Sequence, residues 1–151
     1  MKKKVFNILI LLFLLGHCEY KPIYSDFNQA NFQLNIIDIV GDDEMNNLVS
    51  SSIKKYSNKS SNNIFDVSVK TKYRKENLVK NKKGETTTYL LINEINFNVT
   101  NKEIDKNYSF SETIKTKNNN DQFEFKKYEG SIKANFVNSK INELILELSS
   151  L

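Results

Sequence analysis

The sequence predicts a two-layer α+β domain with the element order β-α-β-β-β-α, in which two helices cover one face of a four-stranded sheet. Three long segments between about 65 and 116 alternate apolar and polar residues, which is the pattern of antiparallel strands with one wet face. Segments with apolar residues at helical spacing flank them, at about 43–57 and 121–149. A shorter alternating segment precedes the first helix, and we expect it to join the same sheet.

The first strand is expected at about 32–40, and it ends at a glycine followed by three acidic residues. The helix at 43–57 follows at once, with Asp42 or Asp43 as the residue that caps its free N–H groups. Acidic residues at its start and lysines at its end both suit the helix dipole. Its apolar stripe is expected to face the core and consists of Met45, Leu48, Val49, Ile53 and Tyr56.

A polar linker leads to the second strand, whose strict alternation runs from Phe65 to Arg74. We expect Glu76–Glu85 to be a lysine-bearing loop, followed by a strand at about 86–100. Leu90 and Ile92 make the middle of that strand apolar on both faces.

A tight turn at Asn101-Lys102 leads to the last strand, at about 103–116. The final helix, 121–149, is capped by the polar segment before it and weakened by Gly130, and a bend near Ser139 is left open. Its expected stripe consists of Phe125, Tyr128, Ile132, Phe136, Ile141, Leu144, Ile145 and Leu148.

The length of 151 residues corresponds to one domain with a short targeting segment. Residues 1–17 contain three of the 22 basic residues and none of the 18 acidic ones, so the remainder is nearly neutral. A nucleic-acid-binding protein should concentrate more positive charge, and we expect no such partner.

The chain has one cysteine and one histidine, which excludes an internal disulfide and a zinc-ribbon spacing. The histidine lies in the apolar leader, so cleavage would leave a mature chain without the usual general base or nitrogen ligand for a metal. The adjacent carboxylates Asp42 and Asp43 are better explained as helix caps than as a catalytic dyad. We therefore expect no enzyme, no cofactor and no metal site.

The N-terminus has the pattern of a secretory signal peptide, because three lysines precede the apolar segment Val5–Leu15. As a helix these residues would span about 16 Å, too short for a bilayer core of about 30 Å. The segment ends in Leu15-Gly16-His17-Cys18, which resembles a bacterial lipobox except that His17 stands where a small residue is usual.

Cys18 could be a buried bystander, a reactive thiol, an incidental residue after a signal anchor, or a lipid attachment point. Its position directly after a signal-length apolar segment favours lipidation, and acyl chains such as palmitate would anchor the protein stably. The expected division is a signal peptide (1–17), a lipidated tether (18–31) and a folded domain (32–151). In enteric bacteria an Asp directly after the lipidated Cys commonly marks retention at the inner membrane. This chain has Glu19 at that position, which favours the outer membrane.

The segment Cys18-Glu19-Tyr20-Lys21-Pro22-Ile23-Tyr24, together with the element order, resembles the LPS-assembly lipoprotein family (LptE, also called rare lipoprotein B). The family often has Gly where this chain has Glu19. The resemblance implies a non-catalytic lipoprotein on the periplasmic side of the outer membrane. Such a protein plugs and helps assemble the LptD β-barrel and takes part in inserting lipopolysaccharide into the outer leaflet.

Basic side chains could meet the phosphates of lipopolysaccharide as point charges. The candidates are Lys72, Arg74, Lys75, Lys80, Lys82 and Lys83. The alternative for these residues is a charged, merely solvated loop. The alternative for the whole protein is another small envelope lipoprotein that carries a lipid or ligand, or serves a different outer-membrane assembly machine.

Overall fold

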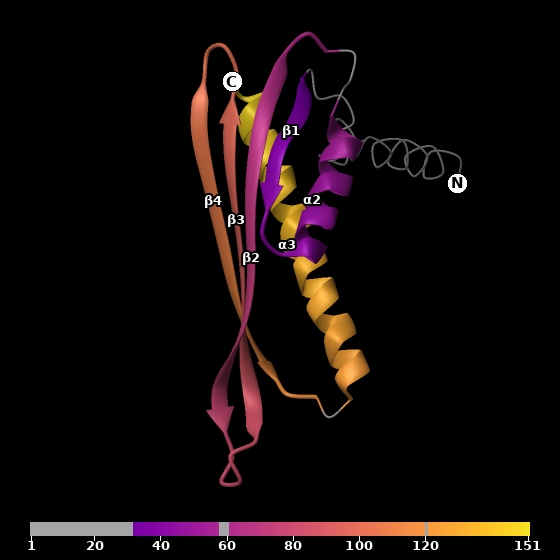
Figure 1. Ribbon diagram of the computed structural model, residues 1–151, viewed down its shortest axis with the longest axis vertical. Coiled ribbons are helices and arrows are strands. Elements are labelled where there is room, and N and C mark those ends of the chain that lie inside the picture. Colours follow the sequence, from indigo (N-terminus) through magenta and orange to yellow (C-terminus); the bar gives the residue numbers. More distant parts are fainter. Residues whose placement is uncertain (1–31, 58–60, 120) are drawn as a thin grey trace, which may run out of the picture.

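The computed structural model describes residues 32–57, 61–119 and 121–151 (Figure 1). The predicted signal peptide and tether, including Cys18, lie outside the described residues. The predicted number, type and order of elements are confirmed, and so is the α+β class. In chain order the elements are β1 (Gln33–Val40), α2 (Asp43–Tyr56), β2 (Ile64–Lys80), β3 (Thr86–Thr100), β4 (Asp105–Lys117) and α3 (Gln122–Ser149).

The sheet has the strand order β1-β2-β3-β4. Strands β2, β3 and β4 form an antiparallel meander, and β1 pairs in parallel with β2 at one edge. Parallel strands need a crossover connection, which α2 provides between β1 and β2. Both helices lie on the same side of the sheet (Figure 1), so the opposite side carries no helix within the described residues. We call this side the open face; its residues include Ser68, Lys70, Lys72 and Arg74 of β2 and Leu90, Ile92, Glu94, Asn96 and Asn98 of β3.

The hydrophobic core fills the layer between the sheet and the two helices. Met45, Val49 and Ile53 of the predicted α2 stripe are buried, whereas Leu48 and Tyr56 are half-buried at its margin. The remaining buried apolar residues of this core are Phe32, Leu34, Phe65, Val67, Val69, Ile95, Phe97, Val99, Phe136, Val137, Ile141, Leu144, Ile145 and Leu148.

The junction between β1 and α2 depends on Gly41. Its φ of +122° is a conformation that side chains rarely permit, and a Cβ there would lie 1.9 Å from the carbonyl oxygen of Thr71. This close approach lets the Asp42 backbone N–H donate to Thr71 Oγ1 at 2.9 Å. The Asp42 carboxylate then caps α2 by accepting from the Met45 N–H at 3.0 Å, so of the two predicted caps it is Asp42 that acts.

Strand β2 is longer than predicted, and the expected loop at Glu76–Glu85 is wrong in its first half. The strand continues to Lys80, with irregular register at Asn77–Lys80, and the loop is confined to Asn81–Glu85. Residues 74–80 are exposed or nearly so on both faces, so no apolar alternation reveals them as a strand. Hydrogen bonding to β3 orders them instead.

The turn between β3 and β4 is also longer than predicted, because β4 begins at Asp105 rather than 103. Asn101 closes this turn. Its Oδ1 accepts from the backbone N–H groups of Glu103 and Ile104, both at 2.8 Å, which holds these residues out of the strand ladder.

Helix α3 is continuous from Gln122 to Ser149, so no break occurs near Ser139. Asp121 caps it by accepting from the N–H groups of Phe123 and Glu124. Gly130 lies against α2, where an added Cβ would come within 3.0 Å of Glu44 Oε1. Tyr128 was predicted to be part of the apolar stripe, but it is 42% exposed because the first turns of α3 contact the sheet through Phe125 instead.

Lys133 of α3 is only 6% exposed and joins three elements. Its Nζ lies 3.1 Å from Asp42 Oδ2 and 2.9 Å from Glu44 Oε2, at the start of α2. The same ammonium group lies 4.2 Å from the ring centroid of Tyr73 on β2. The ammonium group of Lys133 can be buried because two carboxylates and an aromatic ring interact with it.

Candidate functional site

The six basic residues predicted as a ligand site lie along the second half of β2 and in the hairpin that it forms with β3. This hairpin reaches the end of the molecule opposite the C-terminus (Figure 1). The structure divides the six residues into three groups. Lys72 and Arg74 lie on the open face, Lys75 lies on the helix-covered face, and Lys80, Lys82 and Lys83 lie at the tip.

The hairpin tip is an ordered loop rather than a loose one. Asn81 Oδ1 accepts from the backbone N–H groups of Lys83 and Glu85, at 2.9 and 3.0 Å. Gly84 adopts a φ of +82°, which a glycine reaches without steric cost, and its N–H donates to the carbonyl of Asn81. As a result the backbone presents Lys82 and Lys83 in a fixed place, with both side chains exposed.

Beside the tip, the register irregularity of β2 leaves two apolar side chains in solvent. Leu78 is 45% exposed and Val79 is 44% exposed, directly before Lys80. Within the described part of the chain, the ammonium groups of Lys80, Lys82 and Lys83 have no ion-pair partner. Among the described residues, the tip therefore combines cations that have no ion-pair partner with exposed aliphatic side chains.

Arg74 is partly neutralised by its neighbours on the open face. Its guanidinium lies 2.7 Å from Glu94 Oε1 and 3.8 Å from Glu76 Oε1. Lys72 forms no ion pair among the described residues and is exposed. Of these two residues, Lys72 has the freer charge.

Lys75 is separated from the other five residues because it points toward α3. Its Nζ lies 4.0 Å from the ring centroid of Phe125, 4.4 Å from that of Tyr89, and 3.4 Å from Glu129 Oε2. These contacts hold the first turns of α3 against the sheet. The structure thus gives Lys75 a role in packing and does not bring it together with the hairpin tip.

Tyr73 of β2 also attaches α3 to the sheet. Its hydroxyl donates a hydrogen bond to Glu129 Oε1. Burial raises the pKa of Tyr73 well above its usual value, and the hydrogen bond to Glu129 and the nearby carboxylates raise this pKa further, because they favour the neutral phenol.

Three basic residues of the open face were not among the predicted set, namely Lys70 of β2 and two lysines of β4. Lys115 and Lys117 of β4 are exposed and pair in register with Leu90 and Thr88 of β3. Their alternation with Ile114 places them on the open face from sequence alone, but the register that sets them beside Leu90 required the structure. Here two half-buried apolar side chains each have one basic neighbour: Leu90 lies between Lys115 and Glu76, and Ile92 lies between Arg74 and Thr113.

Between this basic region and the end of the sheet where β2 begins, the open face is polar and carries charges of both signs. Amide and hydroxyl side chains form consecutive cross-strand rows, and Asn98 Nδ2 donates to both Asp105 Oδ1 and Asn107 Oδ1, at 3.0 and 3.1 Å. The uncharged residues of these rows are Ser68, Asn96, Asn98, Thr100, Asn107, Ser109 and Ser111, and the charged ones are Asp66, Lys70, Lys72, Glu94 and Asp105. Such a surface can form many hydrogen bonds with a polar wall.

Within the ranges that the structure describes, no three His, Cys, Asp or Glu side chains are grouped so that they could hold a metal ion. Among the described helices, none is both long and apolar enough to span a membrane.

Comparison with known proteins gives similarity in structure but not in sequence. No family model matches the chain, and no curated protein matches it by sequence. Among solved structures, rare lipoprotein B from Shewanella oneidensis superposes with a TM-score of 0.57 at 11% identity, covering 77% of this chain and 98% of the other. The fold is that of rare lipoprotein B. The fold implied by the resemblance, which rested on the segment at Cys18 together with the element order, is thereby confirmed.

Two further lipoprotein structures have similar folds. Lipoprotein B from Nitrosomonas europaea gives a TM-score of 0.51 at 12% identity, with 81% of this chain and 87% of the other covered. A minor lipoprotein from Acinetobacter baumannii gives 0.50 at 12% identity, with coverages of 78% and 92%. The similarity extends over nearly the full length of each lipoprotein, so it concerns the whole fold rather than a shared motif.

Proposed function

We propose that this protein is a non-catalytic, outer-membrane lipoprotein of the LptE type, anchored on the periplasmic side through lipid on Cys18. In this role it plugs and helps assemble an LptD-like β-barrel and takes part in the insertion of lipopolysaccharide into the outer leaflet. The observation that carries the proposal is the fold shared with rare lipoprotein B along almost the whole of that protein. The lipobox-like segment that precedes the domain is an independent argument for the same class.

The open face supports the plug. The lumen of a large outer-membrane barrel is polar, and a domain inside it needs a surface that forms hydrogen bonds without a strong net charge. Amide and hydroxyl side chains of the cross-strand rows supply the hydrogen bonds, and two lysines of β2 nearly balance the three carboxylates of Asp66, Glu94 and Asp105.

The core argues for a plug rather than for a lipid carrier. A carrier needs a cavity for acyl chains, whereas the layer between the sheet and the helices is filled by seventeen buried apolar side chains. The eight half-buried apolar side chains packed against them extend the same filled layer.

The hairpin tip supports contact with lipopolysaccharide. Lys80, Lys82 and Lys83 have no ion-pair partner in the described part of the chain, so their charges are available to phosphate groups. Leu78 and Val79 offer adjacent apolar surface. Lys72 and the neighbouring Arg74 extend this basic surface along the open face of β2. Lys75 is not part of the proposed contact because its ammonium group is engaged with α3.

The test is binding of purified lipopolysaccharide by the full chain in detergent, measured by calorimetry at several salt concentrations. We expect Lys82→Gln/Lys83→Gln to weaken binding roughly 30-fold, since each lysine near an anionic surface contributes about 1 kcal/mol. The matched control is Lys54→Gln/Lys55→Gln, which removes two exposed lysines from the end of α2. Equal losses in the two double variants would contradict the assignment of the hairpin tip.

A further inference from the structure

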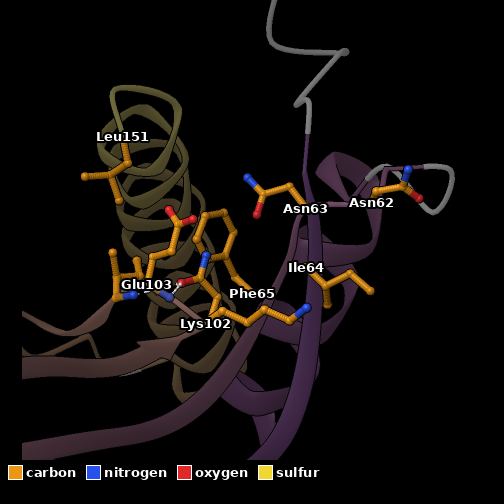
Figure 2. A pocket seen from close by; sticks show the side chains of 9 residues that line it. Asn62, Asn63, Ile64, Phe65, Lys102, Glu103 and Leu151 are labelled. Carbon is orange, nitrogen blue, oxygen red and sulfur yellow. Dashed lines mark hydrogen bonds between the residues drawn. The ribbon is translucent and has the colours of Figure 1, made fainter.

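A pocket of about 540 Å³ lies at the end of the molecule opposite the hairpin tip, where β2 begins and where β3 turns into β4 (Figure 2). This volume is within the range of about 300–1,000 Å³ that is typical of small-molecule sites. The basic residues discussed above are not among its lining residues, so its chemistry is separate from that of the proposed lipopolysaccharide contact.

The polar groups of this pocket are largely unsatisfied by the protein. Within the described residues, the side-chain amides of Asn62 and Asn63 have no hydrogen-bond partner, and neither Lys102 nor Glu103 forms an ion pair. Asn101 uses its Oδ1 to close the turn, which leaves its Nδ2 as a donor. The pocket therefore offers amide donors and acceptors together with one cation and one anion.

An apolar surface lies beneath these polar groups. The ring of Phe65 is 2% exposed and is fixed by an edge-on contact with Phe32 at 5.4 Å between centroids, so it forms the closed floor of the pocket. Asn63, Lys102 and Glu103 line the same pocket as this ring (Figure 2). Ile64 and Leu151, which are 47% and 59% exposed, and the half-buried Ile104 supply the apolar surface that a ligand can reach.

We propose that this pocket binds a neutral saccharide unit. Vicinal hydroxyls both donate and accept hydrogen bonds, as the Asn amides and the Lys102 and Glu103 side chains do, and the C–H face of a sugar ring packs on apolar groups. The charges of Lys102 and Glu103 oppose each other, which disfavours a strongly anionic ligand. The polar groups that line the pocket disfavour an acyl chain, because such a chain would leave them buried and unpaired.

Saccharides of this kind occur as free glycan and as the sugar units of a glycolipid. The probes are therefore N-acetylglucosamine disaccharide for free glycan, and the deacylated core oligosaccharide of lipopolysaccharide for glycolipid sugar. Each is titrated into isotope-labelled full chain in detergent micelles, and backbone amide shifts are recorded. We expect saturating shifts at residues 61–65 and 101–104 with at least one of the two probes, and the probe that binds identifies the source.

The variant Asn63→Ala removes one free amide and keeps the backbone carbonyl that accepts from the Gln33 N–H at 2.8 Å. It should weaken binding roughly threefold to tenfold, the loss of one hydrogen bond. The matched control, Asn47→Ala, removes an exposed amide of α2 and should leave binding unchanged. Absence of shifts at the pocket with both probes, equal losses in the two variants, or tighter binding of phosphoethanolamine than of either sugar would overturn the proposal.

Discussion

Replacing Lys133 with alanine tests whether its buried ion pairs hold α3 onto the start of α2 and onto β2. The side chain of Lys133 is 8% exposed, that of Asp42 is 23% exposed and that of Glu44 is 54% exposed. Removing one partner of a buried pair costs about 3–5 kcal/mol, whereas an exposed pair contributes about 0–1 kcal/mol. Because Asp42 is only partly buried and Glu44 is exposed, we expect Lys133→Ala to lower the free energy of unfolding by about 3 kcal/mol.

The assay is urea unfolding followed by circular dichroism, in which such a loss moves the midpoint by roughly 1.5 M for a slope of about 2 kcal/mol per molar. Lys140→Ala is the matched control, because Lys140 lies on the same helix and pairs only with Glu143, at 2.8 Å and three residues away. This control should cost about 0.5 kcal/mol or less. If Lys133→Ala costs no more than Lys140→Ala, the proposed role of Lys133 is wrong.

Three further predictions concern single residues. Asn93 is fully buried on the helix-covered face of β3, and its amide has no hydrogen-bond partner among the described residues. Asn93→Leu should therefore raise the free energy of unfolding by about 1–2 kcal/mol. A lower free energy of unfolding in chemical denaturation would contradict this prediction. The pKa of Tyr73 is raised in the folded state, so its contribution to stability is complete below the usual tyrosine pKa of about 10 and is lost as the pH rises further. Above a pH of about 10, the free energy of unfolding should therefore decline more steeply in the wild type than in Tyr73→Phe. Parallel plots of this free energy against pH for the two proteins would contradict the prediction. Cys18→Ala should release the protein from membranes on high-salt washing, and the intact mass of the mature N-terminus would distinguish lipidation from an uncleaved signal anchor if partitioning did not change.

The element order was predictable because periodicity in this chain is strong where a face is buried. The alternation from Phe65 to Arg74 and the stripe of Met45, Val49 and Ile53 both follow from one-sided burial. The Gly41-Asp42 junction was also recognisable, since a glycine before a capping residue is a local signal. The second half of β2 was missed because both of its faces are wet and no periodicity marks it.

The candidate site was predicted less completely, because it depends on tertiary register. Sequence grouped Lys75 with the hairpin lysines, but one step along a strand turns a side chain to the other face, and Lys75 contacts Phe125 instead. The burial of Lys133 could not be inferred either, since its partners Asp42 and Glu44 are about 90 residues away in the chain.

The central claim is that the protein works as the plug of a lipopolysaccharide-inserting barrel. The most direct measurement is affinity purification of the C-terminally tagged full chain from solubilised envelopes, with its partners identified by mass spectrometry. Recovery of an LptD-like β-barrel in near-equal amount is the predicted result. Recovery of soluble periplasmic proteins alone, with the barrel left in the unbound fraction, would contradict the claim.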